Sequence, residues 1–170
     1  PDMYTMIWMY HKHAFISSLF NSINESFKKY QKKKGLQYGM TMVFQSVGEG
    51  LSYHPHVHCI ITPGGMNEKH EWEEDLSMNY SEILEGVKKS FSSGFLKKLP
   101  NDAKKRYRMI DNFTKDEWGW NVSFHQNSGE SIVNYLSKSA CGTVVNPEKE
   151  IEWDRLNREI IYQPTGKKIT

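Results

Sequence analysis

The chain has 170 residues, 38% of them hydrophobic and 13% aromatic, which is enough core material for one folded domain. These proportions exclude a disordered chain, a collagen and a coiled coil. The 22 Lys and Arg residues nearly balance the 20 Asp and Glu residues, so the net charge of +2 does not by itself indicate nucleic-acid binding, and any basic surface must be local.

The two cysteines, Cys59 and Cys141, are too few for a disulfide framework, which is typical of a reducing, intracellular environment. The sequence contains no run of about 18 apolar residues, so no membrane span is expected. The amino end also lacks the basic start and apolar middle of a signal peptide. Because the chain starts at Pro1 rather than at Met, we expect residues 1–170 to be a single domain excised from a longer chain.

Residues 13–33 are predicted to form an amphipathic helix, because apolar side chains recur at steps of three and four residues. These side chains are Ile16, Leu19, Phe20, Ile23, Phe27 and Tyr30. The helix should end at Lys32–Lys34, where cations precede Gly35.

Two strands are predicted next, at residues 38–46 and 56–62, since both stretches are rich in β-branched and aromatic residues. Pro63-Gly64-Gly65 should close the second strand. The short glycine-containing loop between the two strands favours antiparallel pairing.

Residues 67–79 are polar and acidic and are expected to form a surface excursion. Residues 81–99 again have helical periodicity, which ends at Pro100, and the stretch that follows is strongly basic. Further along, the pattern predicts a strand at 118–124, a short helix at 129–140 and small strands at 142–146, 149–154 and 158–162. The fold class is therefore α+β, an antiparallel sheet with helices packed on it.

The most informative motif is His54-Pro55-His56-Val57-His58-Cys59. Side chains alternate along a strand, so His56 and His58 should project from one face about 7 Å apart, while Val57 and Cys59 face the core. Two adjacent imidazoles can chelate a metal ion. An isolated His-x-His is more often a pair of surface histidines, but this strand continues into Ile60-Ile61, which indicates a strand of the core.

A third ligand should come from a neighbouring element. If the two strands pair, Gln45 lies near the histidine end, and its amide oxygen suits Mg²⁺ or Mn²⁺. Glu49 in the turn is the main competitor, and His54 either ligates or caps the turn. The alternative for Gln45 is an ordinary exposed strand residue.

Tyr135 lies on the predicted helix 129–140, on a side that adjoins the apolar face and also carries Lys138. Taken alone, a tyrosine there is more often a packing residue. Beside a divalent ion that polarises a phosphate, however, its hydroxyl can attack phosphorus and form a covalent phosphodiester. Lys138 could steady that phosphate or lower the pKa of the tyrosine.

Three segments, in this order, resemble a known superfamily. They are GEGLSYHPHVHCIITPGGM (48–66), SSGFLKKL (92–99) and the block from Trp118 to Asn146, which contains Tyr135-Leu136-Ser137-Lys138. Together they resemble the HUH endonucleases, named for a His-hydrophobic-His motif. More narrowly, they resemble the catalytic domain of rolling-circle insertion-sequence transposases of the two-tyrosine type.

The resemblance implies that His56, His58 and Gln45 bind a divalent ion (Mg²⁺ or Mn²⁺) and that Tyr135 is the nucleophile. Lys138 stands where the family has an arginine. The family's second tyrosine follows the first by four residues, and this sequence has Ser139 there. The layout therefore has one tyrosine, which argues against a mechanism that needs two simultaneous covalent links.

The implied function is metal-dependent nicking and strand transfer on single-stranded DNA through a 5′-phosphotyrosine, as in transposition. The implied partners are hairpin-containing element ends and a second copy of the chain, with no membrane, in a bacterial cytoplasm near the nucleoid. Lys104, Lys105, Arg106 and Arg108 are the favoured DNA contacts, in an expected loop. Three rivals remain: a rolling-circle replication initiator, a non-catalytic DNA-binding module, and a structural zinc protein that uses His54, His56 and His58.

Overall fold

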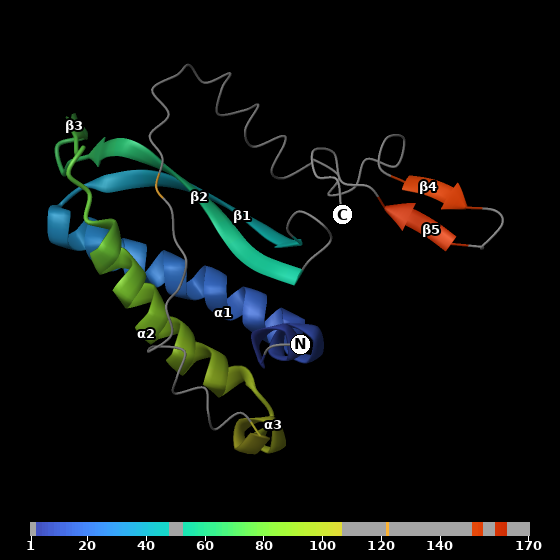
Figure 1. Ribbon diagram of the computed structural model, residues 1–170. Helices are drawn as coiled ribbons and strands as arrows, with labels where there is room; N and C mark the ends of the chain where they lie inside the picture. Colours follow the sequence, from blue (N-terminus) through green and yellow to red (C-terminus); the bar gives the residue numbers. More distant parts are fainter. Residues whose placement is uncertain (1–2, 48–52, 107–121, 123–150, 155–158, 163–170) are drawn as a thin grey trace. The chain divides into compact units, whose positions relative to one another are not determined.

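The computed structural model describes residues 3–47, 53–106, 122, 151–154 and 159–162 (Figure 1). The chain divides into two units, one made of Pro1–Met42 and Cys59–Val122 and the other of Val43–His58 and Ser123–Thr170. The predicted strand at 118–124, helix at 129–140 and strand at 142–146 lie outside the described residues, apart from Val122. Within the described part of the chain, no helix is long and apolar enough to cross a membrane.

The first helix, α1, runs from Met3 to Lys34 and so begins earlier than predicted, with non-helical backbone angles at His11 (φ −131°, ψ 36°). Its end agrees with the prediction. Gly35 has φ +70°, a conformation that glycine adopts without steric cost, and the Leu36 amide donates 3.3 Å back to the Gln31 carbonyl.

Helix α2 (Tyr80–Lys98) packs along α1 (Figure 1), and its bounds agree with the prediction for residues 81–99. The Asn79 side chain caps its start by accepting a 3.1 Å hydrogen bond from the Glu82 amide. Phe91 and Phe95 are 1% and 0% exposed, with ring centroids 5.5 Å apart. Both rings meet Phe15 edge-on.

The buried face of α1 differs in part from the predicted one. Of the six predicted apolar residues, Leu19, Phe27 and Tyr30 are buried. The other three, Ile16, Phe20 and Ile23, are only half-buried. Serines at 18, 22 and 26 are buried instead. Small side chains let the two helices approach closely: a Cβ added at Gly86 would lie 3.0 Å from the Ser26 hydroxyl.

The main sheet has the strand order β1-β2-β3, with bounds Gln37–Val47, Tyr53–Met66 and Trp72–Glu74. The His-x-His motif therefore lies on the central strand, as predicted. β1 and β2 run in opposite directions (Figure 1), and β2 pairs with β3 antiparallel from Gly64↔Glu74 to Met66↔Trp72. This arrangement of strands and helices confirms the α+β class.

The prediction that Pro63-Gly64-Gly65 ends the second strand is wrong, because β2 continues to Met66. The glycines have a different role. A Cβ at Gly64 would overlap the Glu73 carbonyl oxygen, and one at Gly65 would lie 2.8 Å from the Gln37 carbonyl oxygen. Glycine is needed at both positions because the backbones of β1 and β3 lie too close to β2 here to leave room for a Cβ atom.

Residues 67–79 are not wholly a surface excursion. They contain the exposed strand β3, but Asp75 is only 8% exposed and Met78 is 7% exposed. Met78 joins a core cluster with Phe27, Tyr30, Leu36 and Tyr38. The segment after β3 therefore turns inward.

In the second unit, β4 (Ile151–Asp154) and β5 (Glu159–Tyr162) form an antiparallel hairpin with Ile151 opposite Tyr162. The small strands predicted at 149–154 and 158–162 are confirmed.

Candidate metal and DNA-cleavage site

The side chains of Gln45, His56 and His58 meet at one point of the β1–β2 pair. The Nε2 atoms of His56 and His58 lie 3.0 Å apart, and the Gln45 Oε1 lies 3.0 Å from His58 Nε2. All three side chains are half-buried. The structure thus brings together the three residues that the sequence singled out as metal ligands.

Strand alternation explains why these side chains converge. Residues an odd number of positions apart in a strand project from opposite faces. Gln45 is separated in this way from Tyr38 and Met40 in β1, and the two histidines are separated in this way from Ile61 in β2. Tyr38, Met40 and Ile61 belong to the hydrophobic core or pack on it. The site residues therefore project from the other face of their strands, where polar atoms can meet a ligand.

The neighbours of the histidines are less buried than expected. Val57 is half-buried, and Cys59, which alternation places on the same face of β2 as Ile61, is exposed. Pro55 lies far along β2 from Gly64–Met66, the part that pairs with β3 among the described residues. The β2 backbone near Pro55 therefore has no β3 partner that would require its missing N–H.

The electrostatics favour a neutral His58. Burial lowers the pKa of His58, and the nearby His56 lowers it further. A neutral imidazole keeps a lone pair available, which is the form that binds a metal ion.

The distances between the donor atoms also fit a metal ion. In an octahedral site with bonds of about 2.1 Å, adjacent ligand atoms are about 3 Å apart. The two 3.0 Å separations match this spacing. Among the described residues, no group of three or more His, Cys, Asp and Glu side chains could hold a metal ion. Among the described residues, the Gln45 amide oxygen is therefore the side-chain oxygen that lies beside the two imidazoles.

The two competing third ligands lie outside the part of the chain whose side chains are described. Glu49 lies outside the described residues, and His54 lies in β2 with a side chain outside the described set. The predicted nucleophile Tyr135 and its neighbour Lys138 also lie outside the described residues, as does Arg108.

The basic segment expected to be a loop begins instead in helix α3 (Asn101–Arg106). Interactions at the first turn explain why a helix begins here. The Pro100 carbonyl accepts a 2.9 Å hydrogen bond from the Lys104 amide, and Asp102 places a negative charge in the first turn. Lys104 Nζ donates to the Asn101 Oδ1 at 3.4 Å, while Lys105 and Arg106 belong to α3.

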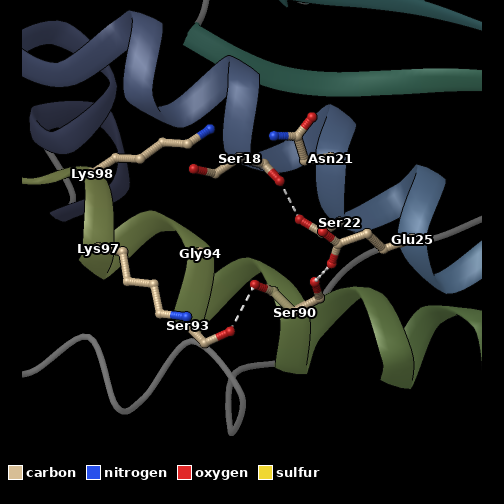
Figure 2. A pocket seen from close by; sticks show the side chains of 9 residues that line it. All are labelled: Ser18, Asn21, Ser22, Glu25, Ser90, Ser93, Gly94, Lys97 and Lys98. Atoms are coloured by element: carbon tan, nitrogen blue, oxygen red, sulfur yellow. Dashed lines mark hydrogen bonds between the residues drawn. The ribbon is translucent and has the colours of Figure 1, made fainter.

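Sequence reasoning missed a polar groove between α1 and α2, shown in Figure 2. Two signals point toward it. Serines recur at positions 18, 22 and 26, which places them on one face of α1. The SSGFLKKL segment at 92–99 places Ser93, Lys97 and Lys98 on the facing helix.

Comparison with known proteins confirms the predicted resemblance to insertion-sequence transposases. The family model Y2_Tnp, described as "Putative transposase", matches residues 39–168, which is most of the chain. A relative, the transposase for insertion sequence element IS801 of Pseudomonas savastanoi pv. phaseolicola, is 29% identical over 73 residues. That alignment covers 43% of this chain and 18% of the relative. No solved structure gives a significant match.

Proposed function

This chain belongs to the Y2_Tnp family of HUH-type insertion-sequence transposases, and we propose that it cuts and rejoins single-stranded DNA through a covalent 5′-phosphotyrosine. The observation that carries the proposal is the convergence of His56, His58 and Gln45. Membership of the family makes DNA transposition the role in which this chemistry would be used.

The three side chains would hold one divalent cation, Mg²⁺ or Mn²⁺. When bound, such an ion supplies positive charge that polarises a scissile phosphate and offsets charge during in-line attack. The two imidazoles would approach the ion from neighbouring positions on one face of β2, and Gln45 would complete the ligand set from β1. Because burial favours a neutral His58, its imidazole keeps a lone pair for the ion.

Tyr135 would be the nucleophile. Its Oη forms a bond to phosphorus while the bond from phosphorus to the 3′ oxygen breaks; the phenol loses its proton, and the leaving 3′ oxygen gains one from solvent. The products are a 5′-phosphotyrosine diester and a free 3′-hydroxyl. A 3′-hydroxyl can reverse the step and join strands without ATP, because one phosphodiester replaces another. Lys138 would steady the phosphate or lower the pKa of the phenol.

The DNA would be held in part by Lys104, Lys105, Arg106 and Arg108, through contacts with phosphates. With Ser139 in place of a second tyrosine, each chain makes one covalent link at a time. We therefore propose that two chains act together at paired element ends. Light scattering of the chain with and without DNA tests for this dimer.

The decisive experiment is adduct formation. The chain is incubated with Mn²⁺ and hairpin-bearing single-stranded oligonucleotides and analysed in SDS. An oligonucleotide labelled at its 3′ end should leave its label on the protein, because the tyrosine keeps the 5′ end of the downstream fragment. Tyr135→Phe should abolish the adduct and retain binding. Tyr10→Phe, at a tyrosine that is 74% exposed, is the matched control and should keep it.

Three outcomes would contradict the proposal. An adduct that persists in Tyr135→Phe identifies another nucleophile. Binding without any adduct in the wild type indicates a DNA-binding module without catalysis. Tightly bound zinc that resists EDTA indicates a structural metal site at the histidines.

A further inference from the structure

A polar cavity of about 290 Å³ lies between α1 and α2 in the first unit (Figure 2). Its polar walls include Ser18, Asn21 and Glu25 from α1, and Ser90, Lys97 and Lys98 from α2. The two ends differ in charge. Glu25 accepts a 2.7 Å hydrogen bond from the Ser90 hydroxyl at one end, whereas the Lys98 ammonium lies at the other, 2.8 Å from the Ser17 hydroxyl.

The hydroxyl of Ser18 is a buried polar group without a partner. Ser18 is 2% exposed, and its Oγ has no hydrogen-bond partner among the described residues. Its backbone carbonyl is occupied by the Ser22 hydroxyl. Figure 2 shows the Ser18 hydroxyl on the side of the cavity where Lys98 ends. A buried hydroxyl in this state is unfavourable, and an oxygen atom of a ligand would satisfy it.

The positive charge of the cavity comes from two lysines of α2. Within the described part of the chain, neither Lys97 nor Lys98 forms an ion pair with a carboxylate. The cationic end of the cavity therefore combines lysines that form no ion pair with a hydroxyl that lacks a partner, and this combination is complementary to an oxyanion.

We propose that the cationic end of this groove binds a phosphate group of the single-stranded DNA, an inference that rests on the proposed function. Lys97 and Lys98 supply charge, and Ser18 and Asn21 donate hydrogen bonds to phosphate oxygens. The size is adequate, since one water occupies about 30 Å³ in the liquid and a phosphate is a group of only a few such volumes.

The alternative is that Ser18 merely lets the helices pack closely, and Ser18→Ala separates the two roles. In a packing role, the substitution removes an unsatisfied hydroxyl and leaves phosphate binding unchanged. In a binding role, the melting temperature without phosphate stays the same or rises, while the rise caused by added phosphate becomes smaller.

The first measurement is the melting temperature of the full chain in inorganic phosphate and in chloride at equal ionic strength. The wild type should gain stability in phosphate. Ser18→Ala and Lys98→Gln should lose most of that gain, whereas Lys69→Gln, an exposed lysine in the β2–β3 turn, should keep it. Glu25→Gln should increase the gain, because a repelling carboxylate is removed. Equal gains in all variants would overturn the site.

The second measurement identifies DNA as the source of the phosphate. Binding of a fluorescent oligonucleotide is followed against salt in a Tyr135→Phe background, where no adduct forms. Each of Lys97→Gln and Lys98→Gln should reduce the slope of log K against log salt by about 0.7 and weaken binding about fivefold at low salt. Lys69→Gln should change neither quantity.

These readouts do not depend on the chemistry at Tyr135. In one outcome, the wild type forms no adduct while the groove variants, and not the Lys69→Gln control, lose DNA affinity. That result would support phosphate binding in the groove and contradict the cleavage proposal. If the adduct forms and the groove variants bind DNA like the Lys69→Gln control, the groove proposal fails, even where inorganic phosphate still binds.

Discussion

The Tyr38 hydroxyl donates a 2.6 Å hydrogen bond to the Asp75 carboxylate, which joins the start of β1 to the segment that leads into α2. Lys34 at the end of α1 pairs with the same carboxylate at 3.2 Å, and the Ser77 hydroxyl donates to it at 2.9 Å. Tyr30 donates more weakly at 3.4 Å. A single buried acid therefore ties α1 and β1 to the segment that leads into α2.

This network predicts a loss of stability in acid. The hydrogen bond from Tyr38, followed by those from Ser77 and Lys34, lowers the pKa of Asp75 to about 2. A depressed folded-state pKa means that the stabilisation is present above the unfolded value of about 3.9 and is lost as the pH falls toward 2. The free energy of unfolding, measured with urea, should fall between pH 4 and pH 2.

Asp75→Asn should remove this pH dependence and destabilise the protein at pH 7 by about 2 kcal/mol. Asp102→Asn, at an exposed position in α3, is the matched control and should preserve the acid loss. A wild-type stability that stays flat from pH 4 to pH 2 would contradict this account of Asp75.

The metal site predicts a difference between two histidines. His58→Ala should weaken Mn²⁺ binding at least about tenfold, because one of three convergent donors is lost. His13→Ala, at an exposed position on α1, should bind Mn²⁺ like the wild type. Titration followed by the EPR signal of free Mn²⁺ measures both. Unchanged affinity in His58→Ala would remove that residue from the ligand set.

The glycines predict opposite responses to the same substitution. Gly65→Ala should destabilise by about 1–3 kcal/mol, because its Cβ would lie 2.8 Å from the Gln37 carbonyl oxygen and the strands would have to separate. Gly94→Ala in α2 meets nothing within 4 Å and should stabilise the helix by about 0.5–1 kcal/mol. Urea unfolding of the two variants checks the sign of each effect.

Removing a ring from the aromatic cluster between α1 and α2 should leave a cavity and lower the free energy of unfolding. Phe95 is fully buried, with its ring stacked on Phe91, so Phe95→Ala should destabilise by about 3–5 kcal/mol. Met9→Ala, at a side chain that is 55% exposed, should change stability by less than about 0.5 kcal/mol. Thermal unfolding of both variants measures the difference, and a loss under about 1 kcal/mol in Phe95→Ala would mean that this interface is loosely packed.

The local patterns determined much of this protein before any tertiary information was needed. The three-four spacing of apolar residues predicted α1 and α2, and alternation along β2 placed His56 and His58 on one face. Gly35 marked the end of α1. These features depend on a few neighbouring residues, because helix and strand periodicities and the φ of a glycine are properties of the local backbone.

Tertiary structure decided what those patterns could not. The position of Gln45 beside His58 depends on the register of β1 against β2, and the burial of Asp75 depends on partners 37 and 41 residues away in sequence. The strand that continues through Gly64-Gly65 and the groove lined by Ser18 and Lys98 depend on how closely separate backbones approach. Such distances are set by long-range packing, so a local pattern can supply the donor groups while only the folded chain brings them together.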